Sequence, residues 1–100
     1  MPKLYIYFDV TVFFYSNEHD PIHVHGESQN RESKAELVIE NGLITKIKYS
    51  ETSGKPPLSR AEMTRFKKVV DAKAEEIAVK WIDYFIYHKK IEPVVIKRKL

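Results

Sequence analysis

The chain has 100 residues, which suits one domain, because a second hydrophobic core would be too small to be stable. Hydrophobic residues make up 43% of the chain and charged residues 31%, which excludes the composition of a disordered protein. There is no cysteine, which excludes disulfides, thiolate metal sites and a cysteine nucleophile, and the net charge is +3.

The N-terminal residues predict a pair of strands. KLYIYF at 3–8 and TVFFYS at 11–16 are rich in aromatic and β-branched residues, which favour strands. Asp9-Val10 between them is a poor two-residue turn, so we expect either a longer loop or one bent strand that carries a bulge. NEHDP at 17–21 predicts a turn that leads into the strand IHVHGE.

The middle of the chain predicts a hairpin. SQNRES at 28–33 is polar and typical of a loop, and it is followed by two alternating runs joined by Asn41-Gly42. Asn-Gly favours a type I′ turn, in which both central residues need positive φ.

A long helix is predicted after the linker at residues 50–57. Ser59 and Glu62 form a capping box, and Leu58 precedes it as a hydrophobic staple. One apolar stripe then follows helical spacing and consists of Met63, Phe66, Val70, Ala74, Ile77, Trp81, Tyr84 and His88. We expect Trp81, Tyr84 and Phe85 to lie in the core. Pro93 blocks further helix, so residues 94–99 are expected to be an extended edge segment or a tail.

These elements predict an α+β fold: an antiparallel sheet of four to five strands with one long C-terminal amphipathic helix packed on one face. We expect a single α+β domain over residues 1–90 and a basic extended tail over 91–100. No apolar run is long enough to cross a membrane or to act as a signal peptide, so we expect a cytoplasmic protein without membrane contact.

Two histidines of the segment HDPIHVHGE are separated by one valine. Alternation along a strand places His23, His25 and Glu27 on one face, with neighbouring side chains ~6.5–7 Å apart at the backbone. Such a pair could bind zinc or another divalent transition metal, with His88 as the third ligand if the helix crosses that face; further donors are Glu18, His19 and Asp20 in the preceding turn.

The same pair could instead perform acid–base chemistry. Two imidazoles one strand step apart could act across a phosphodiester, with a cation such as Arg31 or Lys34 stabilising the developing charge. Under this interpretation the candidate catalytic residues are His23 and His25, with Glu27 and Arg31 as auxiliaries. The simplest interpretation is that His23 and His25 lie on the solvent-exposed face of a half-buried strand.

Positive charge is concentrated in the C-terminal part of the chain. Residues 1–58 contain six basic and eight acidic residues, whereas residues 59–100 contain eleven basic and six acidic residues. This density favours a nucleic-acid backbone or an acidic partner, although a solvated tail would look the same, and the candidate contacts are Lys89, Lys90, Lys97, Arg98 and Lys99.

The run FFYSNEHDPIHVHGE, the segment AELVIENG and the helix end KWIDYF resemble the bacterial domain of unknown function 4160 family, over about residues 3–88. The positions that match its motif are Tyr15, Ser16, Asn17, Glu18, Pro21, His23, Val24 and His25. The resemblance implies a bacterial protein encoded beside a small partner protein, in an arrangement similar to a toxin–antitoxin pair.

We therefore expect a component of a toxin–antitoxin-like module that acts on nucleic acid through the HVH strand, by RNA cleavage if it is an enzyme. The alternatives are a non-catalytic module that binds a protein through the histidine strand or an exposed sheet edge, and a histidine-ligated metal-binding domain. The expected partners are a small cognate protein and RNA or DNA, and self-association is left open.

Overall fold

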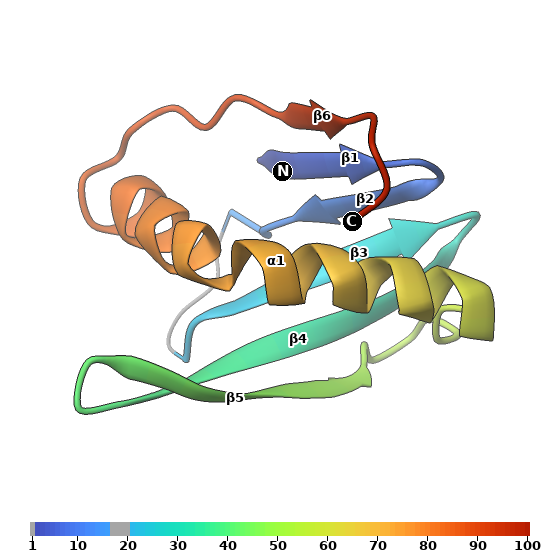
Figure 1. The fold of residues 1–100 in the computed structure, drawn as a ribbon, viewed down its shortest axis with the longest axis horizontal. Helices are drawn as coiled ribbons and strands as arrows, with labels where there is room; N and C mark the ends of the chain where they lie inside the picture. Colours follow the sequence, from blue (N-terminus) through green and yellow to red (C-terminus); the bar gives the residue numbers. More distant parts are fainter. Residues whose placement is uncertain (1, 17–20) are drawn as a thin grey trace.

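The computed structural model describes residues 2–16 and 21–100. These residues form one six-stranded sheet, in the order β5-β4-β3-β2-β1-β6, with a single long helix across one face (Figure 1). The predicted α+β class is confirmed, with one strand more than expected. The elements are β1 (Lys3–Tyr7), β2 (Val10–Phe13), β3 (His23–Ser28), β4 (Arg31–Glu40), β5 (Leu43–Glu51), α1 (Arg60–Phe85) and β6 (Val94–Ile96).

The first hairpin turns one residue earlier than the sequence indicated. Tyr7 pairs with Val10, so Phe8 and Asp9 form the two-residue turn. Phe8 adopts a φ of 54°, a conformation that is unfavourable for a bulky side chain and that sequence patterns therefore did not predict.

The second turn is also tighter than predicted. Ser28 pairs with Arg31, and Gln29 and Asn30 take φ values of 48° and 66°, so the prediction of a loop over residues 28–33 is wrong. The turn lacks the glycine that usually marks this geometry. By contrast, Asn41-Gly42 forms the predicted turn between β4 and β5, with positive φ at both residues.

The helix begins as predicted and ends earlier than predicted. Ser59 is its N-cap and forms the capping box with Glu62. Phe66, Val70, Ile77 and Trp81 of the predicted stripe are buried. The stripe does not reach His88, which lies beyond the end of α1 with a φ of 56° and redirects the chain towards β6.

Residues 94–96 form the edge of the sheet, as one of the two interpretations of this segment predicted. β6 pairs with β1 in parallel, Tyr5 opposite Val94 and Tyr7 opposite Ile96. The Leu100 N–H donates to the Tyr7 hydroxyl at 3.0 Å, so the segment after β6 is attached to the last residue of β1. Within the described residues, no helix combines the length and apolar character needed to cross a bilayer.

α1 packs tightly on β3 at Gly26. A Cβ atom added to Gly26 would lie 2.5 Å from Cδ1 of the Phe66 ring, which is fully buried. Glycine is therefore required at this position by the packing distance of the helix. Because side chains alternate along a strand, Val24 and Gly26 face α1, and His25 and Glu27 face away from it.

Replacing Gly26 with alanine should destabilise the fold by about 1–3 kcal/mol, because the new methyl group overlaps the Phe66 ring. Urea denaturation followed by circular dichroism would measure the loss. The double variant Gly26→Ala/Phe66→Leu should lose less stability than the sum of the two single variants. Full additivity would contradict the proposed contact.

Candidate functional site

The HVH strand lies inside the sheet, between β2 and β4. It pairs with β4 along its whole length and with β2 from His25 to Glu27, so a partner protein cannot add a strand along it. Only β5 and β6 have an open edge among the described strands. The imidazoles can therefore act only through their side chains, on the face that the helix leaves uncovered.

His25 is packed into that face with 4% of its surface exposed. Its ring stacks on Phe13 at 5.5 Å between centroids and meets the edge of Tyr15 at 4.6 Å. Its Nδ1 lies 3.2 Å from Oε2 of Glu32. The imidazole is thus held between two aromatic rings and next to a carboxylate.

Glu32 is a fully buried carboxylate in β4, and it joins the cluster together. The Tyr15 hydroxyl donates to Oε1 at 2.7 Å, and the Lys55 ammonium donates to the same oxygen at 3.0 Å. Burial alone would raise the pKa of Glu32, but these hydrogen bonds and the neighbouring His25 together hold it below its usual value. Glu32 is therefore ionised at neutral pH.

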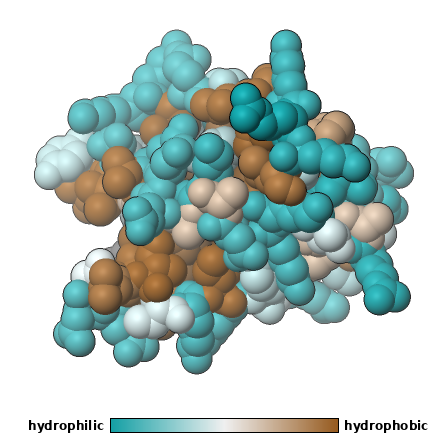
Figure 2. All heavy atoms as spheres, viewed as in Figure 1, coloured by the Kyte–Doolittle hydropathy of each residue, from teal (hydrophilic) through white to brown (hydrophobic). Residues whose placement is uncertain are grey.

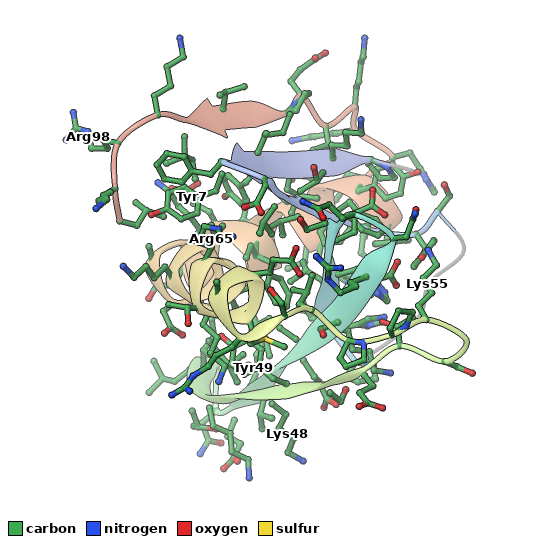
Figure 3. All side chains as sticks on the ribbon, turned by 90° about the vertical axis from the view of Figure 1, so that its right-hand side faces the viewer. Tyr7, Lys48, Tyr49, Lys55, Arg65 and Arg98 are labelled. Atoms are coloured by element: carbon green, nitrogen blue, oxygen red, sulfur yellow. The ribbon has the colours of Figure 1, made fainter. Side chains whose placement is uncertain are left out.

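Register and loop position explain why these residues meet. Glu32 lies opposite Glu27, so its side chain is on the histidine face and diagonal to His25. The Glu32 N–H donates to the Pro56 carbonyl at 2.9 Å, which brings the segment after β5 alongside β4. Figure 3 shows Lys55 on the side of the sheet away from α1.

His23 is partly exposed and lies beyond the last paired residue of β2. Its ring is 5.3 Å from that of His25 and 5.4 Å from that of Trp81, which reaches it from α1. Nδ1 lies 2.7 Å from the Pro21 carbonyl oxygen. Because a carbonyl can only accept, this bond requires a proton on Nδ1 and leaves Nε2 as the basic nitrogen of the neutral ring.

Arg31 and Glu27 are separated by the sheet. Arg31 donates through Nε to Glu62 at 2.8 Å and forms a two-point pair that fixes the start of α1. That pair holds the pKa of Glu62 far below its usual range. Arg31 therefore lies on the helix side, whereas Glu27 is on the histidine face and partly exposed.

His88 is exposed after the end of α1. Among residues 2–16 and 21–100, no three His, Asp or Glu side chains are grouped so that they could hold a metal ion, so the structure does not bring His88 together with His23 and His25. The further candidate ligands Glu18, His19 and Asp20 lie outside the described residues, as do Asn17 and Glu18 of the family motif.

The five basic residues predicted to contact nucleic acid do not form one patch. Lys89 and Lys90 precede β6 and pair with Asp83 and Glu92 at 3.7 and 3.3 Å. The other three follow β6 at its opposite end and are exposed: Lys97, Arg98 and Lys99. Figure 3 shows Arg98 pointing outward from this end of the sheet.

Glu32 and Lys55 were not identified from the sequence. Both lie in polar segments for which the sequence predicts a loop or a linker, and a buried ion pair does not show in a hydropathy pattern. Continuing the alternation of β3 to Ser28 and turning at Gln29-Asn30 would have placed Glu32 beside the histidines. Tyr15 was identified only through the family motif.

Replacing Glu32 with glutamine should lower the free energy of unfolding by about 1–3 kcal/mol at pH 7, because it leaves buried donors poorly satisfied. The folded-state pKa lies below the unfolded value of about 4.3, so the contribution of the ionised group is complete above about pH 5. It is lost as the pH falls through the folded-state pKa. The two proteins should therefore converge in stability once the pH is below the folded-state pKa.

Denaturant titrations at several pH values would test this, with Glu27→Gln as the matched control. Glu27 lies on the same face but is partly exposed, so its replacement should change stability by no more than about 0.5 kcal/mol. A stability difference for Glu32→Gln that stays constant down to pH 2 would argue against ionisation as its source.

A family model described as "Domain of unknown function (DUF4160)" matches residues 10–82, which include the cluster around His25 and most of α1. No curated protein and no solved structure matches the chain.

Proposed function

This chain belongs to the DUF4160 family, whose description assigns no activity, and we propose that it is a component of a toxin–antitoxin-like module that acts on nucleic acid through the HVH strand. The observation that carries the proposal is the position of the two Nδ1 atoms. Nδ1 of His23 is bonded to the Pro21 carbonyl, and Nδ1 of His25 lies 3.2 Å from the Glu32 carboxylate. The bond through Nδ1 makes Nε2 the proton-accepting nitrogen of the neutral His23 ring, as in acid–base enzymes.

The chemistry that suits this arrangement is cleavage of RNA by transphosphorylation. The Nε2 atom of His23 accepts the proton of a ribose 2′-hydroxyl, and the 2′ oxygen forms a bond to the adjacent phosphorus. The bond to the 5′ oxygen breaks, and that oxygen takes a proton from water. The products are a cyclic phosphate and a 5′-hydroxyl, and no further reactant is needed.

His25 and Lys55 have different parts in this proposal. His25 is too buried to touch a substrate, so it is a positioning residue that packs against His23 and connects it to Glu32. The Lys55 side chain is 44% exposed and pairs with Glu32, so its charge is available near the histidine face to a phosphate that gains negative charge.

Replacing His23 with alanine should lower the rate of RNA cleavage by about 10²–10⁴-fold, the usual contribution of a general base, while the protein stays folded. The measurement is a gel assay with labelled RNA, with product ends identified as cyclic phosphate and 5′-hydroxyl. Arg31→Gln is the matched control, because Arg31 acts on the helix side and its loss should affect stability only. Cleavage by His23→Ala at the wild-type rate would contradict the proposal.

A second candidate function, binding of a small protein partner, is favoured by exposed apolar side chains. Figure 2 shows apolar atoms at the surface over the β4–β5 turn and over the C-terminal part of α1. The exposed apolar residues of these two segments are Ile39, Leu43, Val79, Ile82 and Ile86. Leu43 alone is 69% exposed. Apolar side chains gathered in this way are typical of interfaces.

The Leu43→Asp variant should bind the proposed small partner protein at least about tenfold more weakly, because a charge within an apolar contact is desolvated without a partner. Isothermal titration calorimetry would measure this. Val95→Asp is the matched control, since Val95 is 56% exposed but lies on β6. Loss of binding in Val95→Asp alone would instead identify the β6 edge as the interface.

A further inference from the structure

A groove of about 600 Å³ lies at the end of the molecule opposite to the start of β3, between α1 and the β1–β2 turn. Tyr7, Phe8 and Asp9 form one side, the first half of α1 forms the other, and Lys99 lies at the rim. The hydrogen bond from Leu100 N–H to the Tyr7 hydroxyl fixes the backbone next to Lys99. Figure 3 shows Tyr7 and Arg65 facing one another between β1 and α1. The groove shares no residue with the histidine cluster.

Phe8 is in an unusual position for an aromatic residue. It occupies the first central position of the turn with a φ of 54°, although glycine, asparagine or aspartate would be less strained there. Its ring is 56% exposed and meets Tyr7 edge-on at 4.8 Å. An exposed ring adds little to the stability of the fold, so packing does not explain the strained backbone at Phe8. Strained backbone of this kind is typical of ligand sites.

The charges around Phe8 favour an anionic ligand. Arg65 donates to both carboxylate oxygens of Asp9, at 2.7 and 2.9 Å, which neutralises this pair and holds the turn against α1. Lys68 and Lys99 are exposed, and within the described part of the chain neither has an ion-pair partner. The groove thus combines two available ammonium groups with one exposed ring.

We propose that this groove binds single-stranded nucleic acid, with a base stacked on Phe8 and neighbouring phosphates at Lys68 and Lys99. An exposed aromatic ring beside cationic side chains is the combination by which proteins hold single strands without reading their sequence. In a duplex the bases are already stacked, so Phe8 can contribute only to single strands. The inference rests on the proposed function in taking nucleic acid as the ligand, but it does not require the histidines or any cleavage.

The test measures fluorescence anisotropy with labelled oligodeoxythymidylate of about ten nucleotides, within the range of known single-strand sites. This probe has no 2′-hydroxyl, so it reports binding independently of the proposed cleavage. Phe8→Leu should weaken binding about five- to hundredfold, the usual effect of losing one stacked base, whereas Phe8→Tyr should retain it. The double variant Lys68→Gln/Lys99→Gln should reduce the slope of log affinity against log salt by about 1.4.

Lys46→Gln/Lys48→Gln is the matched control, since both lysines are exposed on β5, and Figure 3 shows Lys48 across the molecule from Tyr7. Its affinity should stay within about twofold of wild type once the small change in net charge is screened by salt. His23→Ala should bind as wild type does. If wild type binds the oligonucleotide but does not cleave RNA, the proposed cleavage alone is refuted and the groove proposal stands.

The groove proposal is overturned if the Phe8 and lysine variants bind the oligonucleotide as tightly as wild type, or if a DNA duplex binds as tightly as the single strand. It is also overturned if wild type binds polyglutamate but no oligonucleotide, because the groove would then be a contact for an acidic protein.

Discussion

The approach of Phe66 to Gly26 decides which face of the sheet the helix covers, and the rest of the molecule depends on that choice. Only a residue without a side chain lets the ring lie this close to β3. Once Gly26 faces α1, alternation sends His25 and Glu27 to the opposite face. The pair between Arg31 and Glu62 holds the start of α1 over the same strands. The helix thus builds one hydrophobic core and leaves the histidine face uncovered.

On the histidine face, the buried carboxylate of Glu32 holds the neighbouring side chains together, whereas apolar packing does so beneath the helix. An isolated ionised carboxylate would be costly to bury, so Glu32 has to be matched by donors from separate segments. Tyr15 follows β2, His25 lies in β3 and Lys55 lies in the linker before α1. These contacts fix the rings around His25 and, through them, the position of His23. The groove at Phe8 is independent of this network, so the two proposed sites can be lost separately.

The features that could be predicted from the sequence are those carried by local patterns. Asn41-Gly42 predicts a turn, and the capping box at Ser59 predicts the start of a helix, because each depends only on residues within four positions of one another. The turns at Phe8 and Gln29 lack glycine, so their positions follow from the pairing of the strands on either side and not from the turn residues themselves. Alternation placed His23 and His25 on one face, but no pattern says which face a helix covers or where its stripe stops, and His88 was assigned wrongly to the helix for that reason. Glu32 was missed because the polar residues 28–33 favour a loop and because its donors come from distant segments.

The role of His23 as the base depends on the bond between its Nδ1 and the Pro21 carbonyl. The most direct test is a long-range ¹H–¹⁵N NMR spectrum of the imidazoles at a pH where both rings are neutral. The structure predicts that the neutral His23 ring carries its proton on Nδ1, and that Glu32→Gln changes the signals of His25 more than those of His23. A proton on Nε2 of His23 would contradict the bond to Pro21, and with it the assignment of His23 as the base.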